Sequence, residues 1–271
     1  MPQSASRDTV EPPASEVPLH TDVEVTDGTR PVEPAQPEVA LPRDAVPVEG
    51  IRRVIAEWMT LSAQTAPQFS LRIAGDISET ESLRNHQNAR LERQSRPKVA
   101  LTAVLVKVCA WALTQHPWAN TSLVDGRARS HDEVHVGVAV APDKGLVVPV
   151  LRHADRRGLE ETAADLEDLV ARACGGSLKT EQFSGGTSTV SNLGMFGIDR
   201  FRAIINPPES AILAVGRAVR TAIPMQDDRI VVRPMLDLTL TCDHRVIDGA
   251  TGAACLRQVA DALEHPGLMV D

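Results

Sequence analysis

The chain has 271 residues, of which 42% are hydrophobic, and a formal net charge of −8 at pH 7. A chain of this length and apolar content can bury a sizeable core. The acidic balance argues against a nucleic-acid partner, because nucleic-acid binding needs basic surface that displaces counterions. The longest apolar stretch, 99–113, contains Lys107 and is too short to cross a bilayer, so we expect no membrane partner.

Residues 1–47 differ in composition from the rest of the chain. They hold nine prolines, nine acidic residues and three arginines, and no Phe, Trp or Tyr. Such a segment cannot bury enough apolar surface to offset the entropy that ordering would cost. We therefore expect a disordered, extended tail over 1–47 and a folded domain over 48–271.

The predicted elements of the first half of the domain are a helix, a strand and two more helices. Apolar residues recur at helical spacing over 51–63, and the alternating pattern over 69–74 predicts a half-buried strand. A polar segment over 79–93 and an apolar run over 100–115 predict the other two helices. Pro117 stops the second of these.

The second half of the domain is rich in strands. The patterns over 134–140 and 145–151 predict two strands joined by a turn, and 159–173 is an amphipathic helix that ends at two glycines. The remaining predicted elements are strands over 187–192, 210–219 and 229–240, and a final helix over 250–263.

Helices and strands alternate irregularly along the domain, and the sequence has no internal repeat. This order favours an α/β fold, a two-layer sandwich of a mixed β-sheet and flanking helices, over a doubly wound nucleotide-binding fold. In agreement, no GxGxxG or Walker motif follows a predicted strand.

The four cysteines, Cys109, Cys174, Cys242 and Cys255, show no CxxC spacing, and a chain of this length needs no disulfide staples. We predict reduced thiols in a cytoplasmic protein. The first residues show no basic start followed by an apolar run, so no secretory signal is predicted.

A cluster of titratable residues follows the last predicted strand. Asp243, His244 and Arg245 come directly after it, and Asp248 and Gly249 follow a short gap. Burying such a cluster is costly unless its charges are paired or used. Because histidine takes up a proton near neutral pH, His244 is the candidate general base, although a lone histidine is more often structural.

The pattern Asp-His-Arg-x-x-Asp-Gly over 243–249 resembles the signature of the dihydrolipoyl acyltransferases, which form the cores of 2-oxoacid dehydrogenase complexes. The resemblance covers roughly 48–271 and implies a chloramphenicol acetyltransferase-like fold. It also implies acetyl-CoA as co-substrate and a homotrimer or a higher assembly of trimers. The matching segments are 50–56, 137–150, 183–197 and 204–209, in the order of the family.

The resemblance further implies a mechanism. His244 would remove the proton of an acceptor thiol or hydroxyl, which then attacks the thioester of acyl-CoA without forming an acyl-enzyme. Ser191 would donate a hydrogen bond to the oxyanion, although serines before a glycine loop are often only turn formers. The active site of the family is a channel between trimer subunits, so Ser191 and His244 of one site would come from different copies.

The resemblance gives supporting roles to four further residues. Asp248 would fix the loop that orients His244 through an ion pair with an arginine, and Arg52 and Arg53 are the candidate partners. Asp243, next to the base, would give structural support.

His131 and His135 lie four residues apart among acidic residues and could suggest a metal site. Metal binding would need both histidines on one helix face, whereas His135 enters an alternating strand. We therefore expect no metal.

Some residues depart from the family pattern. The first lysine of the chain is Lys98, and a lipoyl group needs a lysine amine, so we expect no lipoyl group on this chain. Gln68, Ser70 and Ser188 stand where the family usually has a histidine and two aromatic residues, in regions that border its substrate channel. They predict a channel of smaller side chains and greater polarity.

Three functional hypotheses remain. The first is a freestanding acetyl-CoA-dependent O-acetyltransferase that acts on a small-molecule hydroxyl, similar to relatives in natural-product pathways such as tetronate assembly. The second is a dihydrolipoyl acetyltransferase core of a 2-oxoacid (pyruvate) dehydrogenase complex. The third is a scaffold without activity, against which the intact His244 argues. The absence of a lysine before Lys98 favours the first hypothesis.

Overall fold

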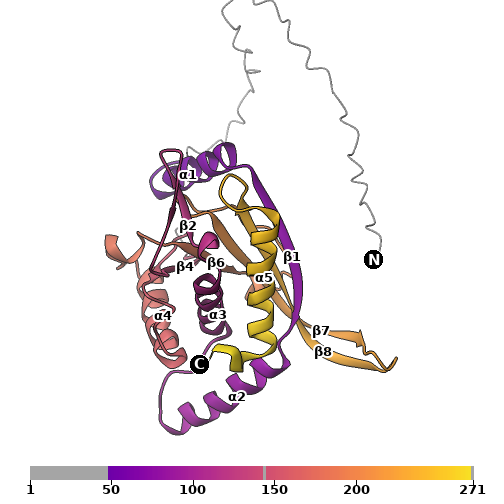
Figure 1. Ribbon diagram of the computed structural model, residues 1–271. Helices are drawn as coiled ribbons and strands as arrows, with labels where there is room; N and C mark the ends of the chain where they lie inside the picture. Colours follow the sequence, from indigo (N-terminus) through magenta and orange to yellow (C-terminus); the bar gives the residue numbers. More distant parts are fainter. Residues whose placement is uncertain (1–47, 143–144, 270–271) are drawn as a thin grey trace, which may run out of the picture. The chain divides into compact units, whose positions relative to one another are not determined.

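A mixed β-sheet is the frame of the folded domain (Figure 1). The computed structural model describes residues 48–142 and 145–269, and the predicted disordered tail lies outside the described residues. The six strands of the sheet follow the order β1-β8-β7-β6-β4-β5. β6 pairs in parallel with β4 and β7, and the other pairs are antiparallel. The strands are Gln68–Asp76 (β1), Val136–Val138 (β4), Val150–Leu151 (β5), Ser188–Asn192 (β6), Ala211–Pro224 (β7) and Ile230–Asp243 (β8).

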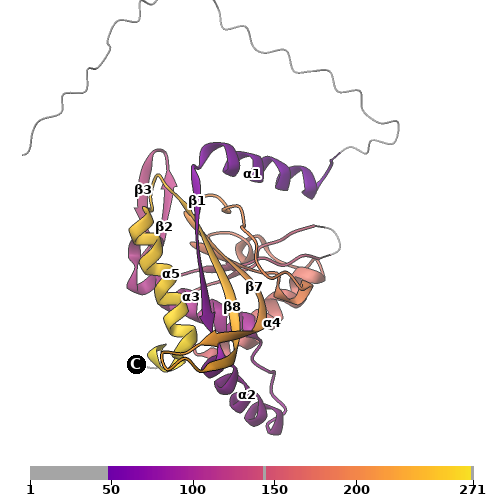
Figure 2. The same cartoon turned by 90° about the vertical axis from the view of Figure 1, so that its right-hand side faces the viewer.

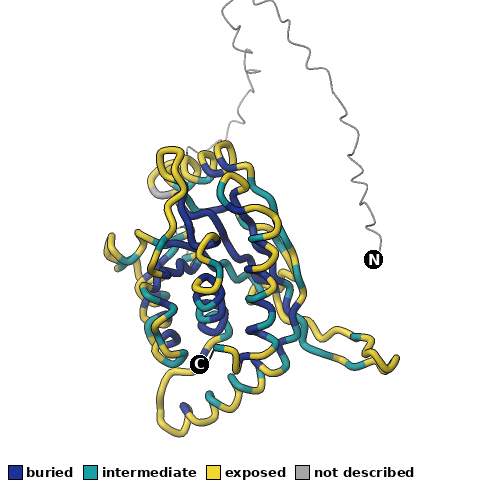
Figure 3. The backbone as a smooth tube through the Cα atoms, in the orientation of Figure 1, coloured by how far each residue is buried: buried dark blue, intermediate teal, exposed yellow. Residues whose placement is uncertain are grey.

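Three helices cover one face of this sheet (Figures 1 and 2). They are α3 (Leu101–Gln115), α4 (Leu159–Cys174) and α5 (Gly249–Glu264). α3 packs against both α4 and α5 and is apolar on nearly every side, so nine of its 15 residues are buried (Figure 3). The predicted two-layer sandwich with a mixed sheet is therefore confirmed.

α1 (Ile51–Thr65) and α2 (Ser78–Arg93) lie at opposite ends of the domain (Figure 1). α2 is polar along its length and is held to the end of α5 by a hydrogen bond of 2.5 Å from Thr80 Oγ1 to the carbonyl oxygen of Leu263. In the described ranges we find no helix with the length and apolarity needed to span a membrane. The described residues also form short 3₁₀ helices: Pro117–Ala119, Thr180–Gln182 and Gly194–Phe196 lie between larger elements, and Pro266–Met269 follows α5.

A hairpin that was not predicted from the sequence follows α3. Its strands are β2 (Thr121–Val124) and β3 (Arg127–Ser130), and they form a separate two-stranded sheet. The turn residues Asp125 and Gly126 both have positive φ, 49° and 71°. An Asp-Gly pair between two short strands is typical of such turns, so the signal was present in the sequence.

The predicted strands over 134–140 and 145–151 form only in part. β4 and β5 are short, and a single bridge between Val140 and Val147 extends their pairing. Pro149 explains part of the loss, because it has no N–H to donate and contributes only its carbonyl oxygen, which accepts from Val138 N at 2.9 Å.

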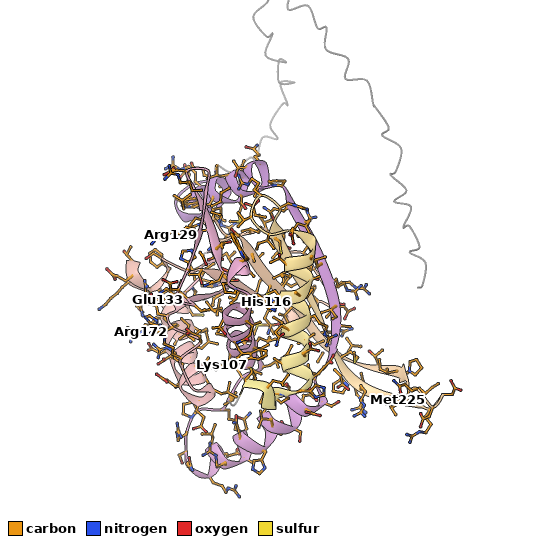
Figure 4. The ribbon with its side chains drawn as sticks, viewed as in Figure 1. Lys107, His116, Arg129, Glu133, Arg172 and Met225 are labelled. Atoms are coloured by element: carbon orange, nitrogen blue, oxygen red, sulfur yellow. The ribbon has the colours of Figure 1, made fainter. Side chains whose placement is uncertain are left out.

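β7 and β8 are longer than predicted. Their pairing continues to Pro224 and Ile230, beyond the part of the sheet where β1 and β6 flank them. The result is a two-stranded arm with Met225 near its tip (Figure 4). The other end of β8, which carries Asp243, leads into the titratable cluster.

Candidate active site

The 243–249 motif folds as a strand end, a turn and a helix start. Asp243 is the last residue of β8, and its carbonyl oxygen accepts hydrogen bonds from Val246 N at 3.1 Å and Ile247 N at 2.9 Å. Ile247 is fully buried and anchors the turn in the core. His244 therefore stands on a short loop that is fixed on both sides.

The buried carboxylate of Asp243 is paired with Arg245. Arg245 Nη2 lies 2.6 Å from Oδ2, Nε lies 3.0 and 3.1 Å from the two oxygens, and the backbone N–H donates to Oδ1 at 3.0 Å. A buried carboxylate is stable in a protein when it is paired and hydrogen-bonded in this way. These hydrogen bonds raise the pKa of Arg245. The partner of Asp243 was not identified from the sequence.

His244 is exposed and is supported by β1. Its backbone N–H donates to the carbonyl oxygen of Pro67 at 3.0 Å. Its ring lies against the ring of Phe69, with centroids 4.7 Å apart and an interplanar angle of 50°. The imidazole is thus open to solvent while its backbone is fixed, an arrangement suited to a general base that must meet a substrate. The role of Phe69 was missed, since nothing in the sequence pairs it with His244.

Asp248 is the N-cap of α5. It is exposed, and its side chain accepts a hydrogen bond from Thr251 N at 2.7 Å. This bond is the largest cause that lowers the pKa of Asp248. The structure does not bring Asp248 together with Arg52 or Arg53 within one copy: both arginines are exposed on α1, and Arg53 lies 3.8 Å from Glu57. Within one copy the structure shows a helix cap at Asp248, and the ion pair with an arginine stays a prediction.

Ser191 lies on β6 at a cavity of about 490 Å³. The cavity is bordered by β4, α3, α4 and the loop after β6, and its lining is largely apolar. The neighbouring Asn192 holds that loop in place: its Oδ1 accepts from Gly194 N at 2.9 Å, and its Nδ2 donates to Thr102 Oγ1 at 3.1 Å. Ser191 thus lines a cavity that is large enough for part of a substrate.

Ser191 and His244 are far apart in one copy. Ser191 is in register with Ala214 of β7, which is in register with Thr239 of β8. His244 lies five residues beyond Thr239, so strand spacing and rise place the two residues about 15–20 Å apart. A general base and an oxyanion donor must both reach the reacting carbonyl group, so one copy does not supply both to one site.

A second cavity, of about 550 Å³, lies beside the His244 loop. It is bordered by α1, the β2–β3 hairpin and the segment 205–209, and Asp243 and Arg245 are among its lining residues. Its existence depends on the unpredicted hairpin, which contributes Leu123 and Val124.

Glu209 is a buried acid at the edge of this second cavity, 5% exposed, and the sequence analysis did not single it out. Its Oε2 accepts from Thr189 Oγ1 at 2.6 Å, and its Oε1 accepts from Asn206 Nδ2 at 3.1 Å. Burial outweighs these hydrogen bonds and raises its pKa from 4.5 to about 7.

Of the two histidines weighed in the sequence, only His135 belongs to a cluster of possible metal ligands, whereas His131 Nε2 lies 2.8 Å from Ser122 Oγ. Glu133, His135 and His153 converge: His135 Nε2 lies 3.1 Å from Glu133 Oε2, and His153 Nδ1 lies 3.8 Å from Glu133 Oε1 (Glu133 is labelled in Figure 4). His135 Nδ1 accepts from His153 N at 3.1 Å. His135 Nδ1 is thus engaged with the backbone of His153, and the expectation that the chain binds no metal stays a prediction.

Two of the residues that depart from the family pattern are hydrogen-bonded inside the domain. Ser188 is 1% exposed, and its Oγ donates to the carbonyl oxygen of Ala211 at 3.3 Å. The prediction that Ser188 borders a channel is therefore wrong for the described chain. Ser70 Oγ lies 3.0 Å from Thr241 Oγ1.

The four cysteines are free thiols. Burial raises the pKa of Cys242 and Cys255 to about 12 and raises that of Cys109 further. Such thiols are not nucleophilic near neutral pH.

The chain matches the family described as 2-oxoacid dehydrogenases acyltransferase (catalytic domain) over residues 41–270. The dihydrolipoyllysine-residue acetyltransferase component of the pyruvate dehydrogenase complex of Rickettsia felis is 36% identical over 225 residues, which are 83% of this chain and 54% of that protein. The corresponding component of the acetoin cleaving system of Bacillus subtilis is also 36% identical, over 83% of this chain and 56% of that protein. The chain thus spans about half the length of these curated relatives.

Solved structures show the same likeness. The dihydrolipoamide acetyltransferase of Azotobacter vinelandii, studied for the catalytic roles of a serine, a histidine and an asparagine, has a TM-score of 0.81 and 31% identity. The match covers 84% of this chain and 94% of that one. The cubic core of a pyruvate dehydrogenase multienzyme complex also has a TM-score of 0.81, with 30% identity over 91% of this chain and 100% of that one.

These similarities overturn the first functional hypothesis. The matching relatives are acetyltransferase components that act on dihydrolipoyl groups, so the prediction of a freestanding tetronate-type O-acetyltransferase is wrong. The resemblance to the dihydrolipoyl acyltransferases, in contrast, is confirmed by the family match. The chain belongs to the 2-oxoacid dehydrogenase acyltransferase family, of which it spans the catalytic domain.

Proposed function

We propose that this domain transfers an acetyl group between coenzyme A and a thiol of a dihydrolipoyl group. The observation that carries the proposal is that His244 is exposed on a hydrogen-bonded loop at the end of β8. The chain belongs to an acyltransferase family, which supports the role of a general base for this residue. The relatives whose names describe their activity are dihydrolipoyllysine acetyltransferases, and they support the choice of acceptor.

The proposed reaction needs one proton carrier and one oxyanion donor. The imidazole of His244 takes the proton of the dihydrolipoyl thiol, and the resulting thiolate attacks the thioester carbonyl of acetyl-CoA. Ser191 Oγ donates a hydrogen bond to the oxyanion of the tetrahedral intermediate, a contribution worth about 3 kcal/mol for a donor of this kind. As the bond to the CoA sulfur breaks, His244 returns the proton to the departing thiolate. The acetyl group passes directly from sulfur to sulfur.

We further propose that each active site is shared by two copies of the chain. The separation of Ser191 and His244 within one copy supports this arrangement, because their positions in the sheet are about 15–20 Å apart. The cavity at Ser191 would receive the acetyl-CoA side, and His244 of a second copy would complete the site. The cubic core among the similar structures supports an assembly of trimers.

Asp248 supports the His244 loop in this proposal. The Azotobacter enzyme has an asparagine four positions after the histidine named with it, and Asp248 lies four positions after His244. As the N-cap of α5, Asp248 fixes the end of the loop that carries the base.

The test is an acetyl-transfer assay with acetyl-CoA and free dihydrolipoamide. The measured quantity is the amount of acetyldihydrolipoamide that forms. The His244→Ala variant should lose activity by about a hundredfold to ten-thousandfold, the range for a general base. The His265→Ala variant is the matched control, because His265 is also exposed but follows α5 at its far end. Absence of acetyldihydrolipoamide with the unaltered protein, or equal loss in both variants, would refute the proposal.

A further inference from the structure

A ring of three hydrogen bonds joins α1, the start of β1 and the loop before β7. Ser62 Oγ donates to the carbonyl oxygen of Ile205 at 2.6 Å, and Ile205 N donates to Gln68 Oε1 at 3.3 Å. Gln68 Nε2 closes the ring by donating to Ser62 Oγ at 3.1 Å, and it also donates to the Ser62 carbonyl oxygen at 3.2 Å. Because a backbone N–H can only donate, the amide oxygen of Gln68 must face Ile205.

Two members of this Ser62–Gln68–Ile205 ring are buried, and Gln68 is half-buried. Ser62 is 2% exposed and Ile205 is 1% exposed. A hydrogen bond lost at such a position leaves a buried polar group without a partner, which costs more than the same loss at the surface. The ring therefore holds the corner between α1 and β1 in one arrangement.

The two residues that support His244 are the chain neighbours of Gln68. Pro67 provides the carbonyl oxygen that accepts from His244 N at 3.0 Å, and Phe69 provides the ring that lies against the imidazole. A shift of the Gln68 backbone would move both supports together. The orientation of the imidazole is thus linked to a buried hydrogen-bond ring that does not include His244 itself.

We infer that Gln68 is a positioning residue for His244. Through Pro67 and Phe69 it keeps the imidazole in the orientation needed for proton transfer; this rests on the proposed function of His244. An amide suits the role because it donates and accepts at the same time at every pH. An ionised carboxylate at this position would accept from Ile205 but could not donate to Ser62.

The test compares Gln68→Met, which keeps the length of the side chain without its hydrogen bonds, with the control Gln115→Met. Gln115 is exposed at the end of α3 and loses only its hydrogen bond to the neighbouring Thr114 Oγ1. Misplacing a catalytic group lowers kcat, so Gln68→Met should lower kcat by about tenfold to a hundredfold. The KM for acetyl-CoA should stay within about twofold, because the Ser191 cavity is unchanged. Gln115→Met should keep the kcat of the unaltered protein.

Ser62→Ala breaks the ring from its other side and distinguishes positioning from general destabilisation. If Gln68 and Ser62 act as one unit, the double variant should lose no more kcat than Gln68→Met alone, whereas independent effects would multiply. All assays are made well below the unfolding temperature of each variant. A kcat for Gln68→Met within about twofold of the unaltered value would overturn the inference.

A readout without turnover separates this inference from the proposed function. The rate at which diethyl pyrocarbonate modifies His244 is measured by peptide mass, with the exposed His265 as internal reference. Loosening of the supports should raise the His244 rate in Gln68→Met by about twofold or more. If the unaltered protein does not acetylate dihydrolipoamide, the proposed function fails, and this rate still decides the inference. An unchanged ratio of His244 to His265 modification overturns the positioning role.

Discussion

Replacement of Glu209 by Gln should remove a pH dependence of stability that the buried carboxyl group causes. Glu209 is 5% exposed, and burial raises its pKa from 4.5 to about 7. Gln has the same shape and keeps both hydrogen bonds, because its oxygen can accept from Asn206 and its nitrogen can donate to Thr189 Oγ1. The variant therefore changes the charge with little change in packing.

The magnitude follows from the two pKa values. Between pH 4.5 and about 7 the folded protein holds a proton that the unfolded chain has released. The free energy of unfolding therefore decreases as the pH rises through this interval, and the contribution is fully present only below pH 4.5. At about 1.4 kcal/mol per pH unit, the difference between the two pKa values corresponds to about 3 kcal/mol.

Urea unfolding of both proteins from pH 5 to 8, at one protein concentration, measures the effect. The unaltered protein should lose stability relative to Glu209→Gln as the pH rises, and above pH 7 the variant should be the more stable of the two. Parallel curves would show that Glu209 is ionised in the folded protein at every pH tested. In that case the hydrogen bonds from Thr189 and Asn206 outweigh burial, and the reasoning is wrong.

Three further substitutions test local features of the site and fold. Arg245→Leu leaves the buried Asp243 carboxylate without its partner and should lower the free energy of unfolding by about 1–3 kcal/mol, measured by urea unfolding. Asp248→Ser keeps an N-cap while removing the charge, so this variant should retain the activity and the melting temperature of the unaltered protein. Asp248→Ala removes the cap and should lower the melting temperature. Loss of activity in Asp248→Ser would favour the ion pair with an arginine instead. Gly216→Ala should prevent folding, because the added Cβ would lie 1.8 Å from the Asp199 carbonyl oxygen. In the control Gly75→Ala, the added Cβ meets only ordinary contacts of 3.7–3.9 Å, so this variant should give soluble, folded protein. Circular dichroism of both variants measures the difference.

Features that depend on local pattern were predictable from the sequence. The five long helices follow helical spacing or apolar runs, and all were predicted within a few residues of their observed bounds. The position of His244 was also predictable, because its motif combines a strand end, a turn and a helix start within one short segment.

Features that depend on contacts between distant segments were not predictable. Ser62 and Ile205 are 143 residues apart, and no pattern around either residue indicates that they share a hydrogen bond. The same holds for Phe69 against His244. For Asp248, the family resemblance suggested a long-range ion pair, whereas the local role as N-cap follows from its place directly before α5.

The choice of acceptor was predicted wrongly for a related reason. The absence of lysine before Lys98 excludes a lipoyl group only on that part of the chain. It does not exclude a dihydrolipoyl group carried by another domain or chain as the acceptor. The side chains at Gln68 and Ser188 looked like changes in a substrate channel, yet both are hydrogen-bonded within the domain.

The most direct test of the account is complementation between two inactive variants. His244→Ala and Ser191→Ala, each with a different affinity tag, are co-expressed, and mixed assemblies are purified through both tags. If each site takes Ser191 from one copy and His244 from another, mixed assemblies contain intact sites and should acetylate dihydrolipoamide well above either variant alone. Activity no greater than the mean of the two separate variants would contradict the shared site.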